Sequence, residues 1–263
     1  MSGFEYLRPK TIQEAVTLLE RGVLLAGGTR VSTKRRQIDA AIDLGDLGLT
    51  DIKIEKGVIS IEAGVRLQSI LESAQPFPEA LRSACRLEAA WNIRNAATLG
   101  GTIMAEDGRS PLLTVLLALD AQVTLEPKSK TLSLESLLQN RKETPIRKLL
   151  TKAQFKQPLS LAYEQVARSP VDRPIVAMAV AKFQAQDDQS TTTIAIGGFG
   201  AFPQRAKKAE EKIAKDESLE SVVNAAISCC DKADDGWASA EYRTAVVGVL
   251  VKRLLATGVR DEN

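Results

Sequence analysis

Alternating apolar and polar positions predict strands along much of the chain. Residues 58–63 carry apolar side chains at every second position, the period of a half-buried strand. Residues 52–55 form a similar stretch just before it, and Lys56-Gly57 between the two predicts a tight hairpin turn. Further strands are expected at residues 23–26, 40–44, 121–125, 161–166, 175–183 and 191–197.

Apolar residues spaced three and four apart predict helices between these strands. Thr11 is suited to cap the first helix, with Glu14 as its capping-box partner. Residues 112–119 are strongly apolar, and Pro111 suits the first turn of a helix there. Further helices are expected at residues 67–73, 81–90, 204–215, 219–227 and 240–255. Loops and charged connections, with one short helix, are expected at residues 95–101, 129–140 and 145–150.

The order of these elements predicts an α+β fold. An N-terminal α+β part precedes a C-terminal three-stranded sheet packed on helices, without the strand–helix alternation of a doubly wound sheet. Because the composition shifts near residue 157, we predict domains at residues 1–157 and 158–263. The first domain is expected to divide into subdomains at about residues 1–55 and 56–157.

The 263 residues are 44% hydrophobic and 26% charged, as in an ordinary globular protein, and they exclude several kinds of chemistry. The absence of histidine removes imidazole as a base, a metal ligand and a triad member, so a zinc enzyme or a Ser-His hydrolase is disfavoured. The three cysteines, Cys85, Cys229 and Cys230, lack Cys-x-x-Cys spacing and favour small buried thiols over a disulfide framework.

Charge and hydropathy disfavour nucleic acid and membrane as partners. The net charge is +2, without a basic stripe carrying interleaved aromatics, and the basic run Lys34-Arg35-Arg36 suits a solvated loop. Residues 1–10 have no apolar signal segment, and apolar runs such as residues 245–251 are too short to span a bilayer. Reduced thiols and the lack of a targeting signal predict a cytoplasmic location.

Two diglycine segments are the first candidates for binding chemistry. Ala26-Gly27-Gly28-Thr29 directly follows a predicted buried strand, and Ala97-Thr98-Leu99-Gly100-Gly101-Thr102 has the same order of small residue, glycine pair and threonine. Glycines let backbone amides approach a phosphate closely, and threonine hydroxyls add donors, so two segments can bind a pyrophosphate from two sides. Each segment alone is also typical of a tight turn. The lysine of a P-loop and the Gly-x-Gly-x-x-Gly fingerprint of a Rossmann NAD site are both missing.

Taken in order, these and later segments resemble the FAD domain of xanthine dehydrogenases, carbon monoxide dehydrogenases, aldehyde oxidases and related molybdenum hydroxylases. The resemblance continues through residues 93–103 and 116–121, then Arg168, Asp172 and residues 175–181. It ends with Ile196-Gly197-Gly198, Arg205, residues 239–243 and residues 250–254, and so covers nearly the whole chain.

The resemblance implies an FAD-binding domain of two α/β subdomains, of the PCMH or vanillyl-alcohol-oxidase-like type, followed by the C-terminal three-stranded antiparallel sheet. It implies FAD as cofactor and an oxidoreductase subunit that takes electrons from the [2Fe–2S] clusters of a small partner subunit. A molybdopterin-binding large subunit would carry the substrate chemistry. NAD, a quinone, a ferredoxin or oxygen would be the electron acceptor.

Carried over by the resemblance, the FAD-binding residues fall in the two diglycine segments. Leu99 would lie near the isoalloxazine ring. Arg30 stands where the family usually has Asp or a small polar residue, and the family's Asp at the FAD sugar has no aligned counterpart, so Asp107 or Glu106 would take over that contact. The candidate cofactor-binding residues are Ala26, Gly27, Gly28, Thr29, Arg30, Thr98, Leu99, Gly100, Gly101, Thr102 and Asp107.

Two other functions compete with a flavin electron-transfer subunit. The chain could be a flavin-free structural or assembly subunit that retains the fold, which the departures at Arg30 and at the missing Asp motivate. A self-sufficient flavin oxidase or reductase is less favoured, because the chain shows neither a nicotinamide fingerprint nor an obvious catalytic base.

Overall fold

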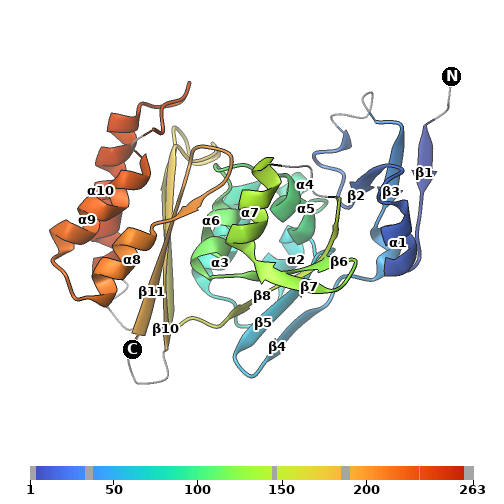
Figure 1. Ribbon diagram of the computed structural model, residues 1–263, viewed down its shortest axis with the longest axis horizontal. Helices are drawn as coiled ribbons and strands as arrows, with labels where there is room; N and C mark the ends of the chain where they lie inside the picture. The colour runs from blue at the N-terminus through green and yellow to red at the C-terminus, as the bar shows by residue number, and fades with distance from the viewer. Residues whose placement is uncertain (1–3, 33–37, 144–146, 185–189, 231, 258–263) are drawn as a thin grey trace. The chain divides into compact units, whose positions relative to one another are not determined.

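The computed structural model describes residues 4–32, 38–143, 147–184, 190–230 and 232–257 (Figure 1). The basic run Lys34-Arg35-Arg36, expected in a solvated loop, lies outside them. The chain forms two compact units that interleave in sequence. Unit 1 comprises residues 1–75, 89–105 and 122–155, and unit 2 comprises residues 76–88, 106–121 and 156–263.

Unit 1 begins with a small parallel sheet of three strands in the order β1-β3-β2. A helix, α1, lies between the first two strands in sequence, and the side-chain oxygen of Thr11 accepts a hydrogen bond from the backbone N of Glu14, as predicted. The Glu14 carboxylate accepts from the backbone N of Lys10, one residue before the cap. The bounds are β1 Glu5–Leu7, α1 Ile12–Leu18, β2 Val23–Leu25 and β3 Ala40–Asp43.

The second sheet of unit 1 has five strands in the order β4-β5-β8-β6-β7. The hairpin predicted at Lys56-Gly57 is confirmed, because β4 pairs antiparallel with β5 on either side of it. The strand bounds are β4 Ile52–Glu55, β5 Val58–Glu62, β6 Gln122–Glu126, β7 Lys130–Ser133 and β8 Leu149–Lys156. The remaining elements of unit 1 are the 3-10 helix η2 at Gly45–Leu47 and helices α2 Leu67–Glu72, α4 Trp91–Arg94, α5 Leu99–Ala105 and α7 Leu134–Glu143.

Three local predictions in unit 1 are wrong. Residues 130–133 were expected in a charged connection with a short helix, yet they form the edge strand β7. Residues 99–101 were expected in a loop, yet they form the first turn of α5, where the Thr98 hydroxyl accepts from the backbone N of Gly101. Residues 145–150 were expected in a connection, yet β8 begins at Leu149 and lies between β5 and β6. At α5 and β8, contacts with distant parts of the chain override weak local preference.

Unit 2 is built on an antiparallel sheet in the order β12-β11-β10-β9. The three long strands match the predicted three-stranded sheet, and β12 adds two residues at its edge. The bounds are β9 Ser160–Val166, β10 Val176–Gln184, β11 Ser190–Gly197 and β12 Gln204–Arg205. The helices are α3 Glu79–Glu88, α6 Pro111–Ala118, α8 Lys207–Ala214, α9 Leu219–Ile227 and α10 Ala240–Thr257, with the 3-10 helix η3 at Ser228–Cys230.

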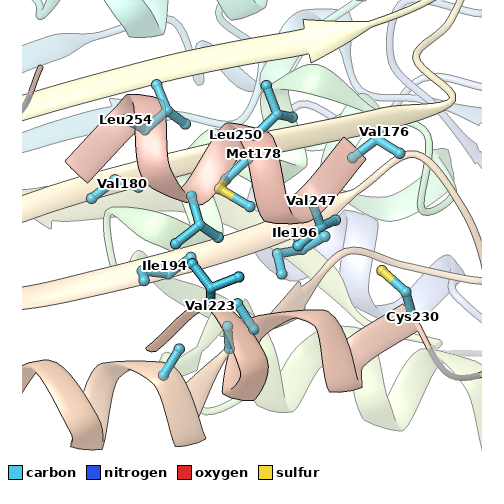
Figure 2. Close-up of a cluster of buried hydrophobic side chains, with 14 of the residues drawn as sticks. Val176, Met178, Val180, Ile194, Ile196, Val223, Cys230, Val247, Leu250 and Leu254 are labelled. Atoms are coloured by element: carbon cyan, nitrogen blue, oxygen red, sulfur yellow. The ribbon is translucent and has the colours of Figure 1, made fainter. Parts of the chain in front are cut away.

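The C-terminal helices cover one apolar layer of this sheet. Figure 2 shows Met178 of β10 and Ile196 of β11 close to Val223 of α9 and Leu250 of α10 in one buried cluster. The predicted C-terminal sheet packed on helices is therefore confirmed. The domain boundary at residues 157 and 158 and the subdomain division near residue 55 stay predictions.

Candidate functional site

A cavity of about 940 Å³ in unit 1 brings the two diglycine segments together. Cavities of this size are typical of sites for cofactor-sized ligands. The first segment follows β2, at the end of the small parallel sheet where ligands of such sheets usually bind. The candidate residues that line the cavity are Ala26, Gly27, Gly28, Thr29, Arg30, Thr98, Gly100 and Gly101.

Gly27 shows how closely the two segments approach each other. A Cβ atom placed on Gly27 would lie 1.9 Å from the carbonyl oxygen of Ala96, far inside van der Waals contact. The next residue, Gly28, has a φ of +70°, a conformation that residues with side chains rarely adopt. Both glycines of the first segment are therefore required by the backbone geometry.

The first segment presents unused backbone donors. Among the residues that the structure describes, the backbone amides of Gly27, Gly28 and Thr29 donate no hydrogen bond. The Gly28 carbonyl accepts from the backbone N of Ser32, which closes the turn behind them. Successive free amides of this kind form a concave site suited to an anion.

The second segment uses its amides differently. The backbone N atoms of Leu99 and Gly100 donate to the carbonyl oxygens of Val65 and Ala63, both at 2.8 Å. The amide of Gly101 donates to the Thr98 hydroxyl at 3.1 Å, and that of Thr102 donates to the Thr98 carbonyl at 2.9 Å. The first two amides fasten α5 to the chain after β5, and the other two bond to Thr98 at the start of α5, so all four are already engaged within the protein.

Leu99 and Thr102 lie below the cavity surface. Leu99 is 1% exposed and Thr102 is 5% exposed, and the described cavity lining includes neither. The roles predicted for these two residues at the cofactor stay predictions.

Asp107, the remaining candidate, belongs to unit 2. Its carboxylate accepts hydrogen bonds from the Arg173 guanidinium at 2.7 and 3.1 Å, and from the backbone N of Arg109 at 2.8 Å. Glu106 contacts the same guanidinium at 3.1 Å. The predicted contact of Asp107 with the FAD sugar stays a prediction.

Among the charged residues that line the cavity, cations outnumber anions. Arginine or lysine occurs at five lining positions (residues 21, 30, 66, 147 and 148), and an acidic residue at two (20 and 39). Arg21 pairs with Glu5 at 3.0 Å, and Arg147 pairs with Glu20. Of these cations, sequence patterns alone single out only Arg30, because the other four lie away from both diglycine segments.

The residues present fit a dinucleotide diphosphate. A turn without side chains, three free amides and an excess of positive charge suit a phosphate-bearing ligand better than a neutral one. In the described part of the chain, no group of three or more His, Cys, Asp or Glu side chains could hold a metal ion.

Comparison with known proteins defines the class. Residues 2–154 match the family described as the FAD binding domain in molybdopterin dehydrogenase, and residues 161–257 match the CO dehydrogenase flavoprotein C-terminal domain. The chain therefore belongs to the family of FAD-binding domains of molybdopterin dehydrogenases, and its cofactor is FAD.

Individual relatives match the chain over nearly its whole length. The protein YgfM of Escherichia coli K12 is 32% identical over 259 residues, 96% of this chain and 95% of that protein. The carbon monoxide dehydrogenase medium chain of Hydrogenophaga pseudoflava is 26% identical over 277 residues, covering 96% of each chain. A crystal structure of Cu,Mo-CO dehydrogenase superposes with a TM-score of 0.84 at 26% identity, covering 97% of each chain. The predicted fold class is thereby confirmed, and the chain is an oxidoreductase subunit.

Proposed function

We propose that this chain is the flavin electron-transfer subunit of a heteromeric molybdenum hydroxylase. The observation that carries the proposal is the meeting of two distant diglycine segments in one cationic cavity. When bound, FAD supplies the redox chemistry, taking electrons from [2Fe–2S] clusters of a partner subunit and passing them to an external acceptor such as NAD.

The chain's own residues hold the cofactor in place. The amides of Gly27, Gly28 and Thr29 donate to the FAD diphosphate from one side. Thr98 adds its hydroxyl from the other side, where Gly100 and Gly101 also line the cavity. Arg30 supplies positive charge beside the first segment.

Two partners complete the proposed complex. A molybdopterin-binding large subunit carries the substrate chemistry, and a small subunit carries the iron–sulfur clusters. The curated relatives support this arrangement, because they include medium chains and subunits of carbon monoxide and 6-hydroxypseudooxynicotine dehydrogenases. No helix in the described ranges is both long and apolar enough to cross a membrane. We place the complex in the cytoplasm.

An absorption spectrum of the purified chain tests the proposal. We expect a flavin spectrum, either as isolated or after addition of FAD, and release of FAD on denaturation. Gly27→Ala should abolish flavin binding, because the new methyl group would collide with the Ala96 carbonyl. Gly236→Ala is the matched control, since its methyl group would meet no atom within 4 Å.

Two other results would each favour one of the competing functions. A wild-type chain that stays colourless with FAD, yet purifies with the two partner subunits, would establish the flavin-free assembly subunit instead. Steady turnover of an organic substrate by the isolated chain would contradict the dependence on a molybdenum partner.

A further inference from the structure

The two sides of the cavity differ in what they can offer a phosphate. The first segment has three amides without acceptors among the described residues, whereas the amides of residues 99–102 are all engaged. A diphosphate held between the segments therefore needs a donor other than the backbone on its second side. Thr98 has one hydroxyl proton to give, because its oxygen already accepts from Gly101.

Arg66 occupies the place from which such a donor would act. It lines the cavity, and its backbone forms an isolated antiparallel bridge with Thr98. Two backbone hydrogen bonds flank the bridge, from the N of Leu67 to the Ala97 carbonyl at 3.0 Å and from the N of Leu99 to the Val65 carbonyl at 2.8 Å. The backbone of Arg66 is thereby held beside the second diglycine segment.

The Arg66 side chain is not committed elsewhere within the described chain. It precedes α2 as the capping residue but makes no side-chain capping bond. Among the described residues, its guanidinium makes no hydrogen bond or ion pair, in contrast to Arg21 and Arg147, which pair with carboxylates. An exposed arginine with five donors and no partner in the described ranges suits bidentate contact with a phosphate.

We infer that Arg66 binds the FAD diphosphate from the side opposite the Gly27-Gly28 turn. There it takes the place of the backbone amides of residues 99–102, which already donate hydrogen bonds within the protein. This inference rests on the proposed function and adds a binding residue to it. The two segments then act differently. The first donates backbone amides, and the second positions a guanidinium.

FAD titrations of the apo-protein, followed by flavin fluorescence, test this role. We expect Arg66→Gln to weaken FAD binding about tenfold at low salt, the usual size of a charge-assisted contact at a partly solvated site. Arg66→Lys should restore part of the affinity. Lys130→Gln removes the same charge from β7, outside the cavity lining, and should bind FAD like the wild type.

Salt dependence separates a charge contact from a change in shape. Raising the salt from about 0.05 to 0.5 M should weaken wild-type binding more than Arg66→Gln binding, because salt screens the lost interaction. Arg66→Gln affinity within twofold of wild type, or a loss that is the same at both salt concentrations, would overturn the inference while leaving the proposed function intact. Failure of the wild type to bind FAD would overturn both.

Discussion

At the scale of single residues, one buried arginine ties several parts of unit 2 together. Arg243 is fully buried in unit 2, although arginine is almost always exposed. Its guanidinium donates to the carbonyl oxygens of Ile175 and Ala238 at 3.2 and 3.1 Å, to that of Ala233, and to the Asp235 carboxylate at 2.8 Å. Burial alone would raise the pKa of Asp235, but hydrogen bonds from Arg243 and two backbone amides lower it overall.

Arg243→Ala should destabilise the protein by about 3–5 kcal/mol, because it leaves a carboxylate and several carbonyl groups without their donor. Arg253 lies further along α10 and is 57% exposed in its ion pair with Glu164. Arg253→Ala should therefore cost less than about 1 kcal/mol. Urea denaturation of both variants measures the difference, and equal losses would contradict the role given to burial.

At the scale of elements, the chain was predictable where local chemistry and tertiary packing agree. The hairpin at Lys56-Gly57 and the helix after Pro111 need only neighbouring residues to define them, and both were predicted. The strand β8 was missed because its partner residues in β6 lie 23 to 32 residues earlier in the chain. In addition, two successive polar residues, Thr151 and Lys152, interrupt its alternation of apolar and polar positions. α5 was missed because two glycines open it.

The candidate site shows the same limit. The first glycine pair could be found from the sequence, because the backbone at positions 27 and 28 accepts only glycine. The engaged amides of Leu99 and Gly100 and the position of Arg66 could not, since both follow from backbone contacts between two segments about thirty residues or more apart in the chain. Sequence patterns therefore located the two diglycine segments, but they did not show which segment has free backbone amides.

The start of α6 is held by a carboxyl group from another helix. Glu88, the last residue of α3, accepts hydrogen bonds from the backbone N of Leu112 at 2.9 Å and from the Ser110 hydroxyl at 2.7 Å. Burial raises the pKa of this carboxyl group from 4.5 to about 7, although the two hydrogen bonds oppose the shift. The residue as a whole is half-buried, whereas its carboxyl group lies in the interior.

Between pH 4.5 and about 7, folded Glu88 keeps a proton that the unfolded chain releases, so rising pH lowers its contribution to stability. Glu88→Gln should remove this dependence, and the stability of the wild type relative to it should fall by on the order of 1–3 kcal/mol from pH 5 to pH 8. Glu79→Gln, at the exposed start of α3, is the control. A constant difference between wild type and Glu88→Gln across this range would contradict the raised pKa.

At the scale of the whole molecule, each compact unit is assembled from separate stretches of chain. The sheet of unit 2 is made by residues 160–205, but α3 and α6 contact its strands and come from residues 79–118. Every residue of α6 is buried. The sequence boundary near residue 157 thus separates the sheet of unit 2 from two helices that pack against it.

A fragment of residues 158–263 should consequently not fold by itself. Without α3 and α6, one apolar face of β9, β10 and β11 would be exposed to water. We expect the fragment to lack a cooperative thermal transition by circular dichroism, whereas the intact chain shows one. A sharp transition in the isolated fragment would mean that its own helices suffice to cover the sheet.

The interleaving of the two units also sets an order of events on the ribosome. The apolar helix α6 leaves the exit tunnel before β10 and β11, which begin at residues 176 and 190. At about 5–20 residues per second, roughly 60 further residues take on the order of 3–12 seconds to appear. During that interval the nascent polypeptide carries α6 as an uncovered apolar segment, which makes the polypeptide a natural client for a chaperone during translation.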